Sequence, residues 1–325
     1  MPIVLLISPS NSSPKPFGVK VFSHPNKAIN MKSKSCKSSL SCFVVSFIIL
    51  SGAFARADSL LHSGETLAFM GDSITQQGAG ASGYIRLVES GLAVNGIEVK
   101  VIPAGISGHK SDQMLARLQK HVLDKNPDWM TLSCGVNDVW HGARGVSLED
   151  YKTNITAIVD QCTEAGVKVL ILTSTPIKET DNELNQKLAG YNEFLRELAA
   201  ERELPLADLN AAFWKELESP TMPRGEGNYL TRDGVHMNPL GNMLMAKGIL
   251  QAFELNDEQI EKAQTDWKTK QTRVRPDVMI SVADYLSLCK IAEEEGTTPG
   301  SVMNLIFRQG LEALFIDPEP LLNKE

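Results

Sequence analysis

The residues Leu67-Ala-Phe-Met-Gly-Asp-Ser-Ile-Thr75 begin with a short apolar run that ends in glycine, and a serine follows one residue into the turn. A helix-like segment begins a few residues later, so the stretch predicts a strand, a turn and a helix. Open α/β sheets place their ligands at the carboxyl ends of strands, where such a turn exposes its hydroxyl group. Ser73 is therefore a candidate site residue, although a lone serine at this position is also a common helix cap.

Downstream of this stretch the sequence alternates short apolar runs with segments that have apolar residues at three- and four-residue steps, as amphipathic helices do. Strands separated by helices predict a parallel sheet that is covered by helices on both faces. Asn238 followed by Pro239 predicts the start of the last helix of this unit, with asparagine as the cap. The expected strands are residues 67–70, 99–103, 129–134, 167–174 and 205–209.

Two further residues could activate the serine. A serine hydroxyl is a weak nucleophile and needs a neighbouring base that a third group orients. Asp233 and His236 lie three residues apart, so one bent segment could aim the carboxylate at one imidazole nitrogen and leave the other for Ser73. Such an aspartate fixes the tautomer and stabilises the imidazolium. Ser73, His236 and Asp233 are therefore the candidate nucleophile, base and orienting group.

Acyl transfer also needs hydrogen-bond donors that are aimed at the developing oxyanion. Gly105 follows the second expected strand and offers a backbone N–H, and Asn137 follows the third and offers a side-chain amide. With the N–H of Ser73, they supply three donors at neighbouring strand ends. Each residue also has an ordinary interpretation as a turn residue. Those interpretations do not explain why all of them occur together in this order.

The blocks Gly71-Asp-Ser-Ile-Thr75, Gly105, Gly135-Val-Asn-Asp138 and Asp233-Gly-Val-His236 together resemble the GDSL or SGNH hydrolase superfamily, in that family's order. The resemblance covers about residues 64–255. It implies a flavodoxin-like three-layer sandwich with a five-stranded parallel sheet. In such a fold Ser73 would be the nucleophile, His236 the base and Asp233 the orienting group, while Ser73, Gly105 and Asn137 would form the oxyanion hole.

The resemblance also implies an activity, that of a serine esterase that forms an acyl-enzyme without a metal or organic cofactor. Because the family includes many carbohydrate O-acetylesterases and the sequence has no long apolar lid, we expect small acyl esters, above all acetyl esters on carbohydrates, as substrates. A lysophospholipase or thioesterase acting on longer chains is the alternative enzyme. A non-catalytic binding or assembly protein is the alternative from another class. Tyr84 and Trp140 are the expected apolar wall of the pocket.

Two other kinds of site are disfavoured. Gly78-Ala-Gly-Ala-Ser-Gly83 matches the dinucleotide fingerprint G-x-G-x-x-G, and Glu98 follows at a suitable distance. The glycines of that fingerprint follow their strand immediately, whereas here the Ser73 turn intervenes, so we expect a flexible lip beside the site. Neither C-x-x-C nor H-E-x-x-H occurs in the sequence, so a zinc site has no support.

The first 57 residues differ in charge from the rest, since they carry seven Lys and Arg and no Asp or Glu. The apolar run 40–50 and the Ala55-Arg-Ala57 pattern predict a secretory signal peptide, with Met31 as an alternative start, and the run is short for a bilayer span. Removing seven of the 32 basic residues and none of the 39 acidic ones leaves a net charge of −14, which disfavours nucleic acid as a partner. We therefore expect an exported protein, periplasmic or extracellular, without stable membrane insertion after cleavage.

The last 70 residues differ again. Residues 256–277 are charged and predict an exposed helix or a linker. Segments 278–282, 283–295 and 299–315 predict a strand and two helices, which weakly resemble the ribbon-helix-helix dimer module; the alternative is a helical hairpin packed on the main domain or on a partner. The expected organisation is a signal region (1–57), a hydrolase domain (58–255), a linker or helix (256–277) and an extension (278–325) that is a candidate homodimer contact. Cys134, Cys162 and Cys289 allow at most one internal disulfide in the processed chain.

Overall fold

The computed structural model describes residues 59–220, 228–271 and 280–316, and its centre is one parallel sheet of five strands. The strand order β2-β1-β3-β4-β5 is the doubly wound order of flavodoxin-like folds. The expected strands are confirmed, with ends that differ by at most two residues. The strands are β1 (Thr66–Gly71), β2 (Lys100–Gly105), β3 (Trp129–Ser133), β4 (Lys168–Leu172) and β5 (Leu206–Ala207).

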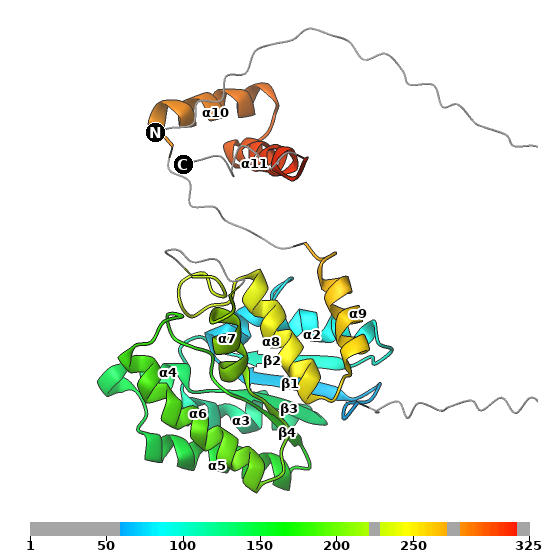
Figure 1. The fold of residues 1–325 in the computed structure, drawn as a ribbon, viewed down its shortest axis with the longest axis vertical. Helices are drawn as coiled ribbons and strands as arrows, with labels where there is room; N and C mark the ends of the chain where they lie inside the picture. The colour runs from blue at the N-terminus through cyan, green and yellow to red at the C-terminus, as the bar shows by residue number, and fades with distance from the viewer. Residues whose placement is uncertain (1–58, 221–227, 272–279, 317–325) are drawn as a thin grey trace, which may run out of the picture. The chain divides into compact units, whose positions relative to one another are not determined.

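Helices cover both faces of this sheet, which gives the expected three layers (Figure 1). One layer contains α3 (Ser111–His121), α5 (Leu148–Glu164) and α6 (Glu183–Glu201). The other contains α2 (Tyr84–Ala93), α8 (Pro239–Ala252) and α9 (Asp257–Trp267). The shorter elements of the domain are α1 (Ser73–Gly78), α4 (Val136–Trp140), α7 (Leu209–Leu217) and the 3₁₀ helices η1 (Leu123–Lys125) and η2 (Gly142–Arg144).

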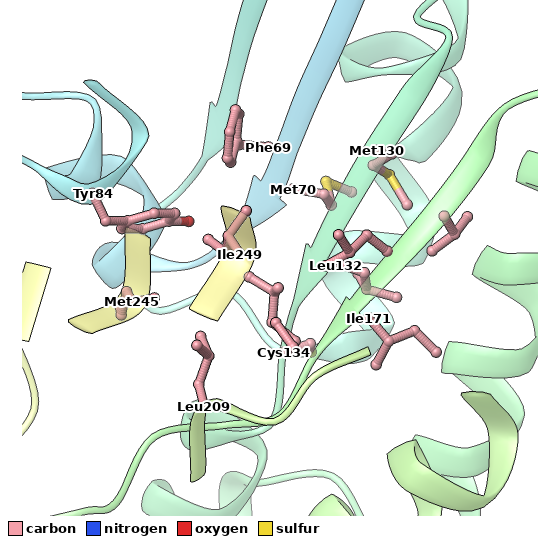
Figure 2. Close-up of a cluster of buried hydrophobic side chains, with 14 of the residues drawn as sticks. Phe69, Met70, Tyr84, Met130, Leu132, Cys134, Ile171, Leu209, Met245 and Ile249 are labelled. Atoms are coloured by element: carbon pink, nitrogen blue, oxygen red, sulfur yellow. The ribbon is translucent and has the colours of Figure 1, made fainter. Parts of the chain in front are cut away.

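The core lies between the sheet and the two helical layers. The central strands are buried on both faces, which is why they read as continuous apolar runs in the sequence. Figure 2 shows Phe69, Met70 and Leu132 of the sheet in the same buried cluster as Met245 and Ile249 of α8. This packing fixes the carboxyl ends of the strands, where the candidate site residues lie.

The charged segment after residue 255 begins with a helix that packs on the core. Helix α9 opens with a capping box between Asn256 and Gln259. Ile260, Ala263 and Trp267 lie on one side of this helix and are buried, and the indole N–H of Trp267 donates to the carbonyl oxygen of Leu87 over 2.8 Å. The helix therefore belongs to the compact domain, which extends past the expected boundary at residue 255.

The C-terminal extension contains a hairpin of two helices, α10 (Val282–Glu294) and α11 (Pro299–Ile316), close to their expected positions. The expected strand 278–282 is not found in its described part, because Ser281 caps α10 by accepting the N–H of Asp284, and Val282 already belongs to the helix. Residues 278–279 lie outside the described residues. The side chains buried within the hairpin are Leu288, Ala292 and Val302. Large apolar side chains remain exposed on both helices, among them Val282, Leu286, Leu305, Ile306, Phe315 and Ile316.

The expected signal peptide, residues 1–57, lies outside the described residues. Among the helices of the described ranges, none is long and apolar enough to cross a membrane.

Candidate active site

The serine lies where the sequence predicts it, at the carboxyl end of β1. Ser73 is the first residue of α1, and Asp72 caps this helix by accepting the N–H of Ile74 at Oδ1 over 2.9 Å. The hydroxyl oxygen of Ser73 lies 2.9 Å from Nε2 of His236, which is a hydrogen-bond distance. Residues that are 163 positions apart in the chain therefore meet at this point.

Asp233 and His236 form the second half of this contact within a single turn. Oδ2 of Asp233 lies 2.7 Å from Nδ1 of His236, while Oδ1 accepts the backbone N–H groups of Val235 and His236 at 3.1 and 2.8 Å. Burial raises the pKa of Asp233, but the hydrogen bonds from the backbone and ring of His236 outweigh it and hold the pKa below its ordinary value. An ionised carboxylate, an imidazole and a hydroxyl thus form one hydrogen-bonded chain, the geometry that proton transfer from the hydroxyl needs.

The loop after β4 holds this turn in place. The carboxylate of Glu179 accepts the three consecutive backbone N–H groups of residues 229–231, at 2.7 to 3.0 Å. The N–H of Lys178 donates to the carbonyl oxygen of Gly234 over 2.7 Å. Lys178 and Glu179 have φ angles of 62° and 43°, a left-handed conformation that costs free energy and that these contacts must offset. Nothing in the local sequence pattern marks either residue, so neither could be predicted from the sequence.

Asn137 lies in α4, directly after β3, and its side-chain amide faces the serine turn. Nδ2 donates to Oδ2 of Asp72 over 3.0 Å and to the carbonyl oxygen of His109 over 3.2 Å. Burial raises the pKa of Asp72 to about 6, although the N–H of Ile74 and the nearby His236 oppose the shift. The amide of Asn137 is therefore anchored beside the first residues of α1.

Gly105 ends β2 and pairs in register with Gly71 at the end of β1. A Cβ atom at position 105 would lie 2.2 Å from the backbone nitrogen of Gln76 and 2.6 Å from the carbonyl carbon of Thr75. The backbone of α1 thus approaches β2 so closely that only glycine fits there. This approach places Gly105 beside the helix that begins with Ser73.

The two residues expected to form the pocket wall differ in exposure. Tyr84 is fully buried, its O–H donates to the hydroxyl oxygen of Thr75 over 2.9 Å, and its ring meets Phe69 edge to face (Figure 2). The prediction that Tyr84 forms the pocket wall is therefore wrong. Trp140 is 40% exposed at the end of α4, with Nζ of Lys178 6.0 Å from its ring centroid.

The glycine segment 78–83 is a tight turn between α1 and α2. A Cβ atom at Gly83 would lie 2.3 Å from the carbonyl oxygen of Gly78, so close backbone contact explains the glycine at position 83. The N–H of Tyr84, the first residue of α2, donates to Oδ1 of Asn242 in α8. The end of the segment at Gly83 and Tyr84 is therefore held against α1 and α8, while the flexible lip stays a prediction.

The described residues hold no group of three or more His, Cys, Asp or Glu side chains that could bind a metal ion. Cys134, Cys162 and Cys289 are free thiols, and the first two are buried. Burial raises the pKa of the Cys134 thiol far above its ordinary value, so this cysteine beside the site is a poor nucleophile.

Comparison with known proteins places these residues in a family. The family model described as GDSL-like Lipase/Acylhydrolase matches residues 69–244, which include all four sequence blocks. An acetylxylan esterase from Geobacillus stearothermophilus is 30% identical over 213 residues, which cover 58% of this chain and 94% of that protein. The crystal structure of an acetyl xylan esterase, AlAXEase, is similar with a TM-score of 0.53 and 33% identity, covering 57% of this chain and 98% of that chain. An uncharacterized lipoprotein, YqeF of Bacillus subtilis (strain 168), is 23% identical over 248 residues, which cover 67% of this chain and 98% of that protein.

With the family model matching more than half of the chain and an esterase aligned over nearly its whole length, the chain belongs to the GDSL-like lipase/acylhydrolase family and is a carboxylic ester hydrolase.

Proposed function

We propose that the chain removes acetyl groups from the hydroxyl groups of a carbohydrate such as acetylated xylan, through a covalent acetyl-Ser73 intermediate. The observation that carries this proposal is the chain of contacts from Asp233 through His236 to Ser73, at 2.7 and 2.9 Å. The two acetylxylan esterases named above support the substrate class.

In the first half of the reaction, Nε2 of His236 takes the proton of Ser73 while Oγ attacks the carbonyl carbon of the ester. The electron pair of the carbonyl bond moves to its oxygen, and the backbone N–H groups of Ser73 and Gly105 and the amide of Asn137 are the proposed donors to this oxyanion. Collapse of the tetrahedral intermediate breaks the bond to the sugar oxygen. That oxygen takes the proton from His236 and leaves as a sugar hydroxyl group.

In the second half, water replaces the sugar. His236 removes one proton from the water as the water oxygen attacks the acetyl carbon, and the second tetrahedral intermediate collapses to acetic acid, which ionises to acetate in solution. Oγ of Ser73 leaves as it takes the proton back from His236, which restores the starting state. Asp233 stabilises the imidazolium in both halves and holds the ring in one tautomer.

Asn137 can serve as a donor only by exchanging a partner. Both hydrogens of its Nδ2 are engaged, by Asp72 at 3.0 Å and by the carbonyl oxygen of His109 at 3.2 Å. We expect the oxyanion to displace the longer contact, because the anionic acceptor forms the stronger, charge-assisted hydrogen bond. The shorter contact to Asp72 would then hold the amide in place.

We propose Trp140 as the wall that contacts the sugar. Its half-exposed indole lies one helical turn beyond Asn137, and binding sites for organic ligands commonly use aromatic faces of this kind. Lys178, whose ammonium group lies over the ring, is bonded through its backbone N–H to Gly234 in the turn that carries His236. The Trp140–Lys178 pair thus connects the two sides of the site.

We further propose that the protein is exported. The support is the expected signal peptide in residues 1–57, together with the name of the Bacillus subtilis relative, a lipoprotein. Expression of the full chain followed by N-terminal sequencing of the exported product checks this: processing before Asp58 is the expected result, and an intact N-terminus inside the cell contradicts it.

The extension is the proposed contact between two copies of the chain, because the α10–α11 hairpin leaves large apolar side chains such as Leu305 and Phe315 exposed. Light scattering on residues 58–325 should give the mass of a dimer, and on a chain that ends at residue 271 the mass of a monomer. Equal monomer masses would end this idea.

Hydrolysis of nitrophenyl esters from acetate to decanoate by residues 58–325 tests the activity, followed by release of acetate from acetylated xylan. We expect the rate to peak at acetate and to fall on the order of 10⁴-fold or more in Ser73→Ala. A peak at long chains would favour a lysophospholipase or thioesterase instead. Unchanged hydrolysis in Ser73→Ala would contradict the mechanism, and no hydrolysis in either protein would favour a binding role.

A further inference from the structure

A buried arginine that the reaction itself does not use lies behind the proposed oxyanion hole. Arg117 belongs to α3 and is 8% exposed. Its Nη1 donates to the carbonyl oxygen of Ala104 and its Nη2 to that of Gly71, both over 2.8 Å, and Nε donates to Nδ1 of His109 over 3.1 Å. Among the described residues, no carboxylate lies within salt-bridge distance of this guanidinium.

Burying this unpaired guanidinium destabilises the folded state. Burying a charge costs free energy unless the charge is paired and fully hydrogen-bonded, and among the described residues two backbone carbonyls and one imidazole supply the hydrogen bonds of this guanidinium. An apolar side chain of similar length would fill the same space without that cost. The guanidinium therefore needs a reason other than packing, and its partners supply one.

The contact with Ala104 acts on Gly105. In a planar trans peptide unit the C=O of one residue and the N–H of the next point in opposite directions. A donor held on the carbonyl oxygen of Ala104 thus fixes the direction of the N–H of Gly105. Because hydrogen bonds polarise one another in series, a cationic donor on that oxygen also makes the N–H a stronger donor.

The other two contacts act on the remaining donors. Gly71 O belongs to the peptide unit that leads into Asp72, the residue before Ser73, so Nη2 fixes the start of the serine turn. Nε fixes the ring of His109, whose carbonyl oxygen accepts the Asn137 amide until the oxyanion takes its place. One planar guanidinium with donors in a rigid fork therefore contacts the residue before Gly105, the start of the serine turn, and the residue that holds Asn137 before substrate binds.

We propose that Arg117 is a positioning residue that aligns the oxyanion hole from behind and strengthens the N–H of Gly105 as a donor to the transition state. The proposal rests on the proposed function only in so far as Ser73 attacks an ester and Gly105 and Asn137 face the oxyanion. It does not depend on the identity of the acyl group or of the sugar.

Steady-state hydrolysis of nitrophenyl acetate by the full processed chain tests it, with Arg117→Met and Arg117→Lys as variants. Phenylboronic acid, which forms a tetrahedral adduct with an active-site serine, supplies a second readout. We expect kcat to fall roughly 10- to 100-fold in Arg117→Met, less than the ~10²–10³-fold typical of removing a direct donor. KM should change less than about threefold, and the inhibition constant of the boronic acid should rise in proportion to the loss of kcat, because only the tetrahedral state uses the donors.

Arg117→Lys keeps the charge but replaces the fork by one ammonium group, so its kcat should lie between those of the wild type and Arg117→Met. If Arg117→Met fails to fold, Arg117→Lys alone tests the proposal, since we still expect its kcat to be several-fold lower than that of the wild type. Arg196→Met is the matched control. The half-buried Arg196 forms a 2.8 Å ion pair with Asp208, which is not part of the serine turn. Losing this pair should lower thermal stability while kcat stays unchanged.

The outcomes separate the two proposals. Unchanged kcat and boronate affinity in the folded Arg117 variants would overturn the positioning role and leave Arg117 as a structural residue. A rise in KM alone would do the same, because it indicates substrate binding rather than transition-state alignment. Hydrolysis that does not depend on Ser73 would overturn the proposed mechanism and this inference together, whereas a preference for longer esters would overturn only the proposed substrate.

Discussion

The side-chain amide of Asn137 donates to Oδ2 of Asp72 over 3.0 Å, and this contact joins the end of β3 to the turn that carries Ser73. Asp72 is only 3% exposed, and its carboxylate also accepts the N–H of Ile74. The position of a proposed oxyanion donor therefore depends on a buried carboxylate whose pKa is about 6, close to neutral pH.

The first prediction concerns this carboxylate and pH. The pKa of Asp72 is raised from 3.8 in the unfolded chain to about 6, so the native state binds the proton more tightly. Its stabilising contribution is complete below pH 3.8 and is lost as pH rises through 6. Asp72→Asn cannot ionise, so its stability relative to the wild type should increase by about 3 kcal/mol between acidic and slightly alkaline pH.

Urea unfolding of both proteins at several pH values measures this difference. The exposed Asp181→Asn variant is the control and should show no comparable trend. A stability difference between Asp72→Asn and the wild type that stays constant with pH would contradict the prediction.

The second prediction concerns Glu179, whose carboxylate accepts the N–H groups of residues 229–231. Glu179→Gln replaces one acceptor oxygen by an amide that faces backbone donors, so we expect a loss of about 1–3 kcal/mol. Because the turn with Asp233 and His236 follows directly, kcat should also fall. Thermal unfolding and ester hydrolysis measure the two effects. Glu164→Gln, an exposed change at the end of α5, should alter neither stability nor kcat. Wild-type kcat in Glu179→Gln would contradict the prediction, because it would show that the turn with Asp233 and His236 keeps its position without Glu179.

The third prediction concerns the close approach at Gly105. A methyl group there would meet backbone atoms of Thr75 and Gln76, which cannot move aside as a side chain can. Gly105→Ala should therefore cost ~1–3 kcal/mol and move α1, so that kcat falls much more than stability alone explains. Gly190→Ala is the matched control, because its nearest contact is a Leu148 methyl group at 3.5 Å in the middle of a helix. It should raise stability by about 0.5–1 kcal/mol and leave kcat unchanged; equal effects of the two alanines would contradict the argument.

The fourth prediction concerns α9 as part of the hydrolase domain. Trp267 is 3% exposed and donates to the carbonyl oxygen of Leu87. Trp267→Ala should cost ~3–5 kcal/mol, as the loss of a large buried side chain does. A chain that ends at residue 255 should be unstable, whereas one that ends at residue 271 should unfold like the full chain. Urea unfolding distinguishes the cases; a stable, active chain ending at residue 255 would show that α9 is dispensable.

The sequence predicted the sheet and the contact between Ser73, Asp233 and His236, because both depend on patterns that can be read directly along the chain. Buried parallel strands are apolar on both faces, and residues at strand ends meet at one edge of the sheet. Asp233 and His236 are neighbours in the chain, so their contact needed only a local turn.

The side-chain orientations in the helices could not be predicted in the same way. Tyr84 and Arg117 both lie at helix positions where a rotation of the helix by one residue changes what the side chain contacts. In the charged segment, Ile260, Ala263 and Trp267 form a buried stripe, but the surrounding acidic and basic residues outweigh it in composition. Glu179 accepts bonds from residues about 50 positions later, and only the folded chain reveals such partners.

The turn that carries both Asp233 and His236 reduces what the rest of the molecule has to control. Carboxylate and ring are joined by bonds that begin and end within four consecutive residues, so this dyad has its internal geometry without help from distant elements. What remains is a single separation, that between the ring nitrogen and the hydroxyl oxygen of Ser73. Gradual loss of activity on warming would then reflect a prebuilt acid–base unit moving away from its nucleophile as a rigid whole, with the dyad itself still intact.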